Sequence, residues 1–310
     1  MKSVFRILIA LMVIAATVLT IAPYIRADEA GSKQLDETWL TVEKSSLSKE
    51  AKLGMLTKAD RAVRAGIPAE DVAVIITRGL RQGVESVRIE SFLETATRTK
   101  EQGLPTRLVL DRIEQGLAKG IPAENISGVT NRLSKNLAVA KPIVSKLESE
   151  GIKSTRAGGS EDAVETVARA LEKSITRDAV MSTGERVKEQ KGSMALFNRA
   201  VDTMTTFVGS GMTAKQAEKI VHTAVDKGYS ERDLEAMERY MVNELRKNHS
   251  MNDVAADMES RMEHGEMMRG IQEGSRNGPM NGPGSGNMGG GTMRGPGSGN
   301  MGSRPGMGGM

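Results

Sequence analysis

The residues of this chain best suited to chemistry are methionines and histidines near its C-terminal end. Met258 and Met262 stand four residues apart, as do His264 and Met268, so each pair would share one face of a helix. Thioether sulfur and imidazole nitrogen are soft ligands that suit Cu(I). These four residues therefore form a candidate soft-metal site, to which the methionines beyond residue 274 could add ligands.

The same methionines also fit a purely structural interpretation. Met251, Val254, Met258 and Met262 recur at helical spacing, and methionine commonly fills gaps in protein cores. The spacing fits packing at least as well as coordination. We therefore favour packing, predict no cofactor, and keep Cu(I) binding as the alternative.

Catalysis has little support in the sequence. There are three histidines and no cysteine, and neither His-Glu-x-x-His nor Gly-x-Ser-x-Gly occurs. His222 is expected at a surface or core edge. The Gly-x-Gly-x-x-Gly matches at 284–289 and 297–302 have neither a strand before them nor a helix after them, as a dinucleotide loop requires. We predict that the protein is not an enzyme.

The elements that would position these residues are helices separated by a recurring turn of Gly, an apolar residue and Pro, Ser or Thr. Glycine can close a helix in the left-handed conformation, and Pro, Ser or Thr can begin the next helix. Strand signals are absent. The turn occurs at Gly66-Ile67-Pro68, Gly103-Leu104-Pro105, Gly120-Ile121-Pro122, Gly211-Met212-Thr213 and Gly228-Tyr229-Ser230.

Alignment on these turns predicts an internal repeat. Gly120, Ser174 and Gly228 are each 54 residues apart, and apolar residues recur six positions after each of them. We predict three-helix units of about 54 residues, each with a third helix near 139–150, 193–209 or 251–268, and one shorter unit before them. The fold class is all-α, as tandem short-helix repeats in an α-solenoid-like stack or an irregular bundle.

The N-terminus resembles a targeting segment. Lys2 and Arg6 precede an apolar run over residues 7–22, and Ala27 is a small residue suited to a cleavage site. Residues 1–27 are therefore expected to be a secretory signal peptide cleaved after Ala27. The alternative is an uncleaved membrane anchor through residues 5–22. Either reading predicts export to a bacterial periplasm or cell envelope.

The remaining chain divides into a linker at 28–46, a helical-repeat domain at 47–273 and a Gly/Met-rich tail at 274–310. The tail composition predicts disorder. The net charge of +4 comes from the ends, because the leader and the tail each hold three basic residues and no acidic one. The body carries −2, which gives no electrostatic footprint for nucleic acid.

The segment Ile113-Glu-Gln-Gly-Leu-Ala-Lys-Gly-Ile-Pro-Ala-Glu-Asn-Ile126 resembles helical-repeat segments of exported bacterial proteins with no assigned activity. The likeness covers mainly 66–134 and 158–240 and transfers no functional residue. We expect an exported, non-enzymatic binding or scaffolding module of the bacterial envelope, with a protein or peptide partner.

Overall fold

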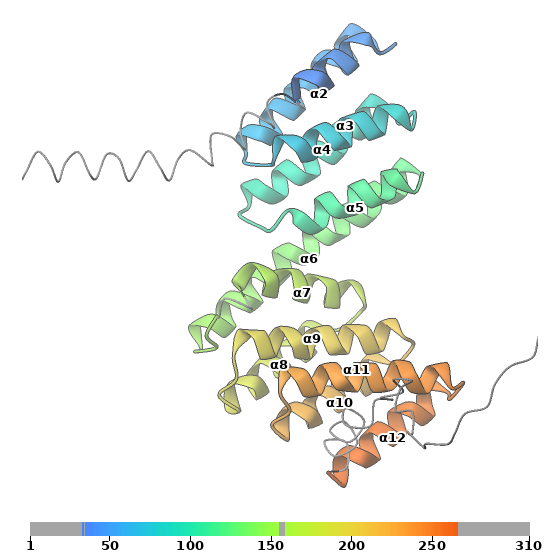
Figure 1. The fold of residues 1–310 in the computed structure, drawn as a ribbon. Coiled ribbons are helices and arrows are strands. Elements are labelled where there is room, and N and C mark those ends of the chain that lie inside the picture. Colours follow the sequence, from blue (N-terminus) through green and yellow to red (C-terminus); the bar gives the residue numbers. More distant parts are fainter. Residues whose placement is uncertain (1–32, 34, 155–158, 266–310) are drawn as a thin grey trace, which may run out of the picture.

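A computed structural model describes residues 33, 35–154 and 159–265, which form helices joined by short turns and contain no strand (Figure 1). This confirms the predicted all-α class. Residues 35–44 are also helical. The helices in chain order are α2 (Lys49–Arg64), α3 (Ala69–Arg81), α4 (Ser86–Glu101), α5 (Arg107–Ala118), α6 (Ala123–Ser149), α7 (Ser160–Glu172), α8 (Arg177–Glu189), α9 (Met194–Gly209), α10 (Ala214–Asp226), α11 (Glu231–Arg246) and α12 (Met251–Glu263).

Each helix from α2 to α12 is followed by a residue in the left-handed conformation. At Gly120, φ is 63°, and the N–H of Ile121 donates to the carbonyl oxygen of Gly116 at 3.0 Å. This hydrogen bond, five residues backward, is the Schellman closure of a helix end. Glycine takes the conformation at most of these turns, and Ser174, Lys191 and Asn248 take it at the others. The turn predicted from the sequence is confirmed.

Hydroxyl side chains begin the helices of the C-terminal half. In each case the side-chain oxygen accepts a hydrogen bond from a backbone N–H of the first helical turn, which satisfies a donor that the helix itself leaves free. These residues are Thr176, Ser193, Thr213, Ser230 and Ser250, which precede α8 to α12.

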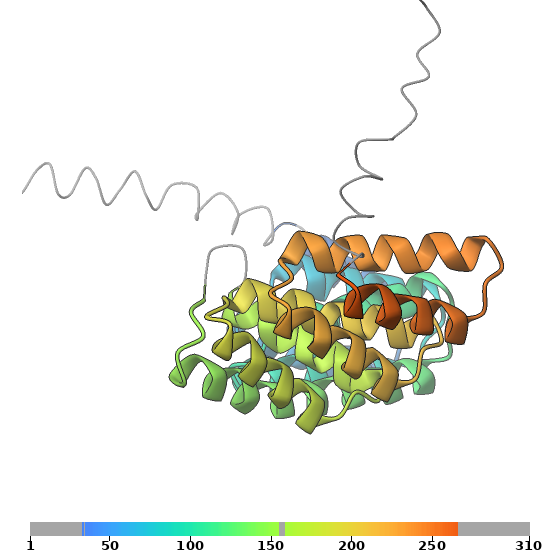
Figure 2. The same ribbon diagram turned by 90° about the horizontal axis from the view of Figure 1, so that it is seen from below.

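The helices stack in two rows, because each packs against the next but one. Ion pairs mark this pattern: Lys58 of α2 reaches Glu94 of α4, and Arg78 of α3 reaches Glu114 of α5. The even-numbered helices form one row and the odd-numbered helices form the other (Figure 2). The same step recurs at Arg88–Glu124, Arg107–Glu165, Arg169–Asp202, Arg186–Asp226, Arg199–Glu238 and Lys219–Glu259.

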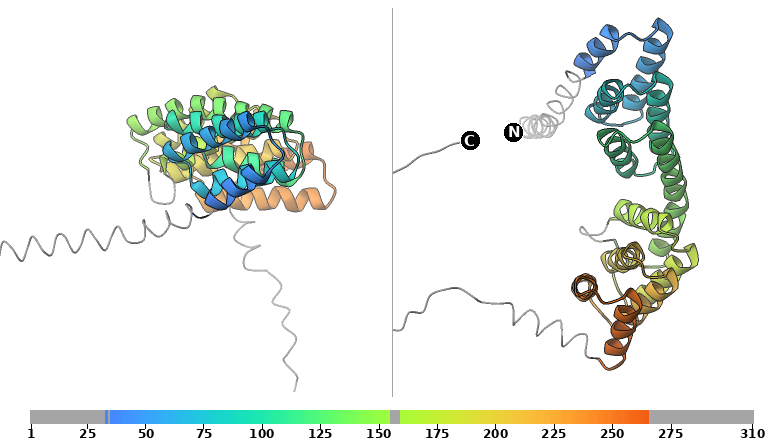
Figure 3. Two further views of the ribbon diagram at one scale, coloured as in Figure 1. Left: turned by 90° about the horizontal axis from the view of Figure 1, so that it is seen from above. Right: turned by 90° about the vertical axis from the view of Figure 1, so that its right-hand side faces the viewer.

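The stack is curved, and the odd-numbered row follows the inner side of the curve (Figure 3). One continuous apolar core runs between the two rows, from Val42 to Met262. Its largest fully buried side chains include Phe92 of α4, Ile113 of α5 and Phe197 of α9. The rows are therefore held together by apolar packing, and the ion pairs lie nearer the surface.

The structure does not confirm the predicted 54-residue unit. α6 is one helix of 27 residues where two helices were predicted, so the separate helix at 139–150 is wrong. No left-handed turn occurs between Gly120 and Gly151, and Gly128 lies inside the helix, so the helix continues. Most neighbouring helices of the even-numbered row begin 37 residues apart, as α8 and α10 do, whereas α6 and α8 begin 54 apart because α6 is long. One layer of the stack therefore holds two helices.

The linker predicted at 28–46 is also partly wrong. Residues 35–44 are helical, with Val42 fully buried and Thr38 only 4% exposed. The two buried residues are four apart, which gives this short helix a face that packs against the stack.

The predicted leader, including Ala27, and the tail at 274–310 lie outside the described residues. Within the described residues, no helix combines the length and the apolar character that crossing a bilayer requires.

The left-handed turns predict opposite effects for one substitution at two glycines. Gly120 has φ of 63° and Gly128 lies inside α6, and an added Cβ would meet no atom closer than 3.9 Å at either position. Gly120→Ala should destabilise by about 1–2 kcal/mol because it strains the backbone. Gly128→Ala should stabilise by about 1 kcal/mol because glycine weakens a helix interior. Urea unfolding measures both, and shifts of the same sign would contradict the turn geometry.

Candidate functional site

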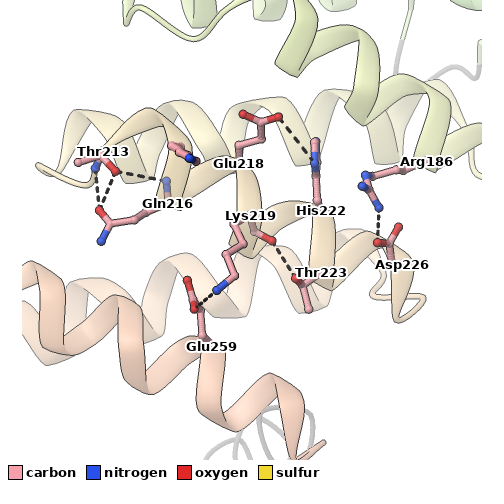
Figure 4. Close-up of a pocket in the computed structure, with 10 residues that line it drawn as sticks. Arg186, Thr213, Gln216, Glu218, Lys219, His222, Thr223, Asp226 and Glu259 are labelled. Carbon is pink, nitrogen blue, oxygen red and sulfur yellow. Dashed lines mark hydrogen bonds and ion pairs between the residues drawn. The ribbon is translucent and has the colours of Figure 1, made fainter.

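A trough of about 570 Å³ runs along α10, between α8 and α12 of the even-numbered row (Figure 4). Helix α10 supplies most of its lining, and Glu218, His222 and Asp226 recur there every four residues on one face. The complete lining is Arg186, Thr213, Lys215, Gln216, Glu218, Lys219, His222, Thr223, Asp226 and Glu259.

His222 links α10 to α8 at the floor of the trough. The residue is 8% exposed, and its Nε2 lies 2.9 Å from the Thr183 hydroxyl oxygen. That hydroxyl donates its single hydrogen to the Ala179 carbonyl oxygen at 2.8 Å. The Thr183 oxygen must therefore accept the bond from His222, which assigns the ring hydrogen to Nε2. The Nδ1 atom lies 3.9 Å from a carboxylate oxygen of Glu218.

The surroundings of His222 favour its neutral form. Burial lowers the pKa of the ring below its usual value of 6.5, and the positive charge of Arg186 lowers it further. The negative charges of Glu218 and Asp226 act in the opposite direction but do not overcome burial. The histidine is therefore a neutral, hydrogen-bonded link between two helices.

Two ion pairs connect the walls of the trough. Arg186 of α8 pairs with Asp226 of α10, and Lys219 of α10 pairs with Glu259 of α12. Figure 4 shows both contacts beside His222. Because each pair contributes one positive and one negative side chain, the trough has mixed charge. It therefore favours neither anionic nor cationic ligands.

The hydroxyl groups near His222 are not arranged as nucleophiles. An activated hydroxyl must give its hydrogen to a neighbouring base. The Thr183 hydrogen goes to a backbone carbonyl instead, and the Thr223 hydroxyl likewise donates to the Lys219 carbonyl oxygen at 2.8 Å. The geometry is that of a buried polar contact, and it contains no nucleophile–base pair.

The structure does not bring the four predicted metal ligands together. Met258 and Met262 are fully buried in the core, as the packing interpretation proposed. His264 is exposed at the end of α12, where its Nδ1 lies 2.8 Å from the Ser260 carbonyl oxygen. Met268 lies outside the described residues. Within the part of the chain that is described, no three histidine or carboxylate side chains converge to hold a metal ion.

The polar contacts of the trough were not predicted from the sequence. Thr183 and His222 are 39 residues apart, and Arg186 and Asp226 are 40 apart. Both separations are close to the 37-residue step from α8 to α10, so polar residues about one layer apart in the sequence indicate these contacts. The predicted 54-residue unit corresponds to a different spacing.

Comparison of the chain with models of protein families, with curated proteins and with solved structures gives no match.

The buried position of His222 predicts a pH dependence of stability. Because its pKa is lower in the folded state, the unfolded chain takes up a proton first as the pH falls. The free energy of unfolding should therefore fall below about pH 6.5 and level off below the folded-state pKa. His222→Gln should weaken this dependence.

Urea unfolding at about pH 7.5 and 5.5 measures the change in the free energy of unfolding. Both values lie above the pKa of most carboxylates, so the charge of the acidic residues changes little between them. His264→Gln is the matched control, because His264 is exposed at the end of α12 and none of the ion pairs among the described residues contains it. An equal pH dependence in the parent and in His222→Gln would contradict the assignment.

Proposed function

We propose that this protein is an exported, non-enzymatic helical-repeat scaffold of the bacterial envelope that binds a protein or peptide. The observation that carries the proposal is the curved, two-row stack of short helices. Such stacks expose long inner surfaces on which an extended partner can lie. Several helices contribute to that surface at once, and binding of a partner there needs no enclosed cavity.

The ends of the chain support the location. The basic start, the apolar run over 7–22 and the small Ala27 are typical of a cleaved secretory signal. If cleavage does not occur, the same run anchors the protein in the inner membrane. In both cases the helical body is on the far side of the membrane from the cytosol.

The inner side of the curve indicates the chemistry of the partner. The odd-numbered helices, which form this row, carry side chains of both signs, in pairs such as Arg78–Glu114 and Arg169–Asp202. Exposed pairs of this kind stabilise by only about 0–1 kcal/mol, so a partner can replace one member at little cost. A polar peptide segment with charges of both signs fits this surface best.

Site-specific cross-linking tests the proposal. A photoreactive residue is placed at exposed Asp111 of α5 or Glu235 of α11 on the inner row. Matched controls carry it at exposed Lys135 of α6 or Glu185 of α8 on the other row. We expect one shared adduct from the inner positions, in the envelope fraction, and none from the controls. Equal labelling from both rows, or protein found only in the cytosol, would contradict the proposal.

Periplasmic Cu(I) binding is the second function, favoured by the clustering of methionine and histidine near the C-terminus. The burial of Met258 and Met262 places two of the proposed ligands where a metal would have to disrupt the core. An anaerobic Cu(I) titration of the full chain at micromolar metal should therefore show no uptake that depends on Met258 or Met262. Uptake that Met258→Leu or His264→Ala abolishes would instead support the metal function.

A further inference from the structure

The two ends of the stack present different surfaces to solvent. The outward residues of α12 are Asn252, Ala256, Ser260 and Glu263, which are small or polar. At the other end, Leu53 of α2 is 65% exposed and Leu40 of the preceding helix is 54% exposed. A terminal helix of a stacked-helix protein needs a polar outer face. The C-terminal end has one, and the N-terminal end does not.

The exposed leucine belongs to a regular stripe along α2. Lys49, Leu53, Leu56 and Asp60 are spaced by four, three and four residues, the pattern of a coiled-coil seam. Met55, Ala59 and Ala62 are fully buried against the stack on another side of α2. Within the stripe Leu53 is exposed, and Leu56, at its edge nearer the core, is half-buried. Helix α2 therefore has one face in the core and a second seam that faces away from it.

We propose that this second seam pairs α2 with α2 of a second copy of this chain, in antiparallel orientation. A two-fold axis between residues 54 and 55 brings Leu53 against Leu56 of the second copy. The same axis brings Lys49 against Asp60 of the second copy, and symmetry repeats both contacts. The seam is thus self-complementary, as a two-fold interface requires.

The charges select the antiparallel orientation. A parallel pair would place Lys49 beside Lys49 and Asp60 beside Asp60, and like charges at such short range are unfavourable. In the antiparallel pair the apolar residues occupy the centre and opposite charges flank them. Asp60 already pairs with Arg64 of its own helix at 3.0 Å, so its carboxylate is held at the surface.

The interface is small. A single pair of 16-residue helices buries less than the roughly 1,200–2,000 Å² typical of stable complexes. The dimer is therefore weak and depends on protein concentration, with exchange between monomer and dimer.

Sedimentation velocity of the full chain in a mild non-ionic detergent tests the pairing. Leu53→Asp should raise the dissociation constant at least about tenfold, because it places a charge against Leu56 of the second copy at the apolar centre of the interface. Val87→Asp is the matched control: Val87 is 61% exposed, on α4, and should leave the dissociation constant unchanged. A monomer at all concentrations, or an equal effect of both variants, would overturn the proposal.

A charge exchange tests the orientation. Lys49→Asp alone should weaken the dimer, and Lys49→Asp combined with Asp60→Lys should restore it. A parallel pair would not recover, since like charges would still meet, so lack of recovery would overturn the antiparallel register.

The chain has no native cysteine, so maleimide labelling of Leu53→Cys reports on this site alone. Protection that persists at low protein concentration would show that the chain covers its own seam, and would also overturn the proposal.

Discussion

The left-handed residue at the end of each helix is the constraint on which the rest of the structure depends. It closes one helix with a hydrogen bond such as that from the N–H of Ile121 to the carbonyl oxygen of Gly116. The next helix begins within a few residues everywhere except between α6 and α7. Successive helices must then reverse direction and lie side by side, which places alternate helices in alternate rows. Where no left-handed turn occurs, between Gly120 and Gly151, α6 runs on for 27 residues. The spacing of these turns therefore sets both helix length and the order of the stack.

The ion pairs within each row have a nearly constant direction. The positive residue lies on the earlier helix and the negative residue on the later one, as in Lys58–Glu94 and Lys219–Glu259. Lys188–Glu150 runs the other way. Each exposed pair adds little stability. A helix stacked the other way round would bring like charges together, however, so the direction of the pairs favours one polarity of the stack.

Local features were predictable from the sequence, and features that depend on stacking were not. The turns and most helices follow from glycine, capping residues and apolar spacing. The 54-residue unit failed because its two equal intervals hold different sets of helices. Only α6 and α7 lie between Gly120 and Ser174, whereas α8, α9 and α10 lie between Ser174 and Gly228. The contact of His222 with Thr183 depends on how α8 packs against α10. For Met258 and Met262 the sequence favoured core packing over Cu(I) coordination, but only the position of α12 in the stack shows that both side chains are buried.

A weak dimer and a shallow inner surface would complement each other. A partner on the inner side must exchange existing ion pairs, such as Arg169–Asp202, for its own contacts, so each contact adds little to the free energy of binding. Two copies joined through α2 would present two such surfaces to one partner. The second contact then forms within the complex, at an effective concentration set by the geometry of the dimer, and total affinity rises without any new kind of contact. The apolar seam at one end of the stack would thus increase the binding strength of a surface whose individual contacts are weak.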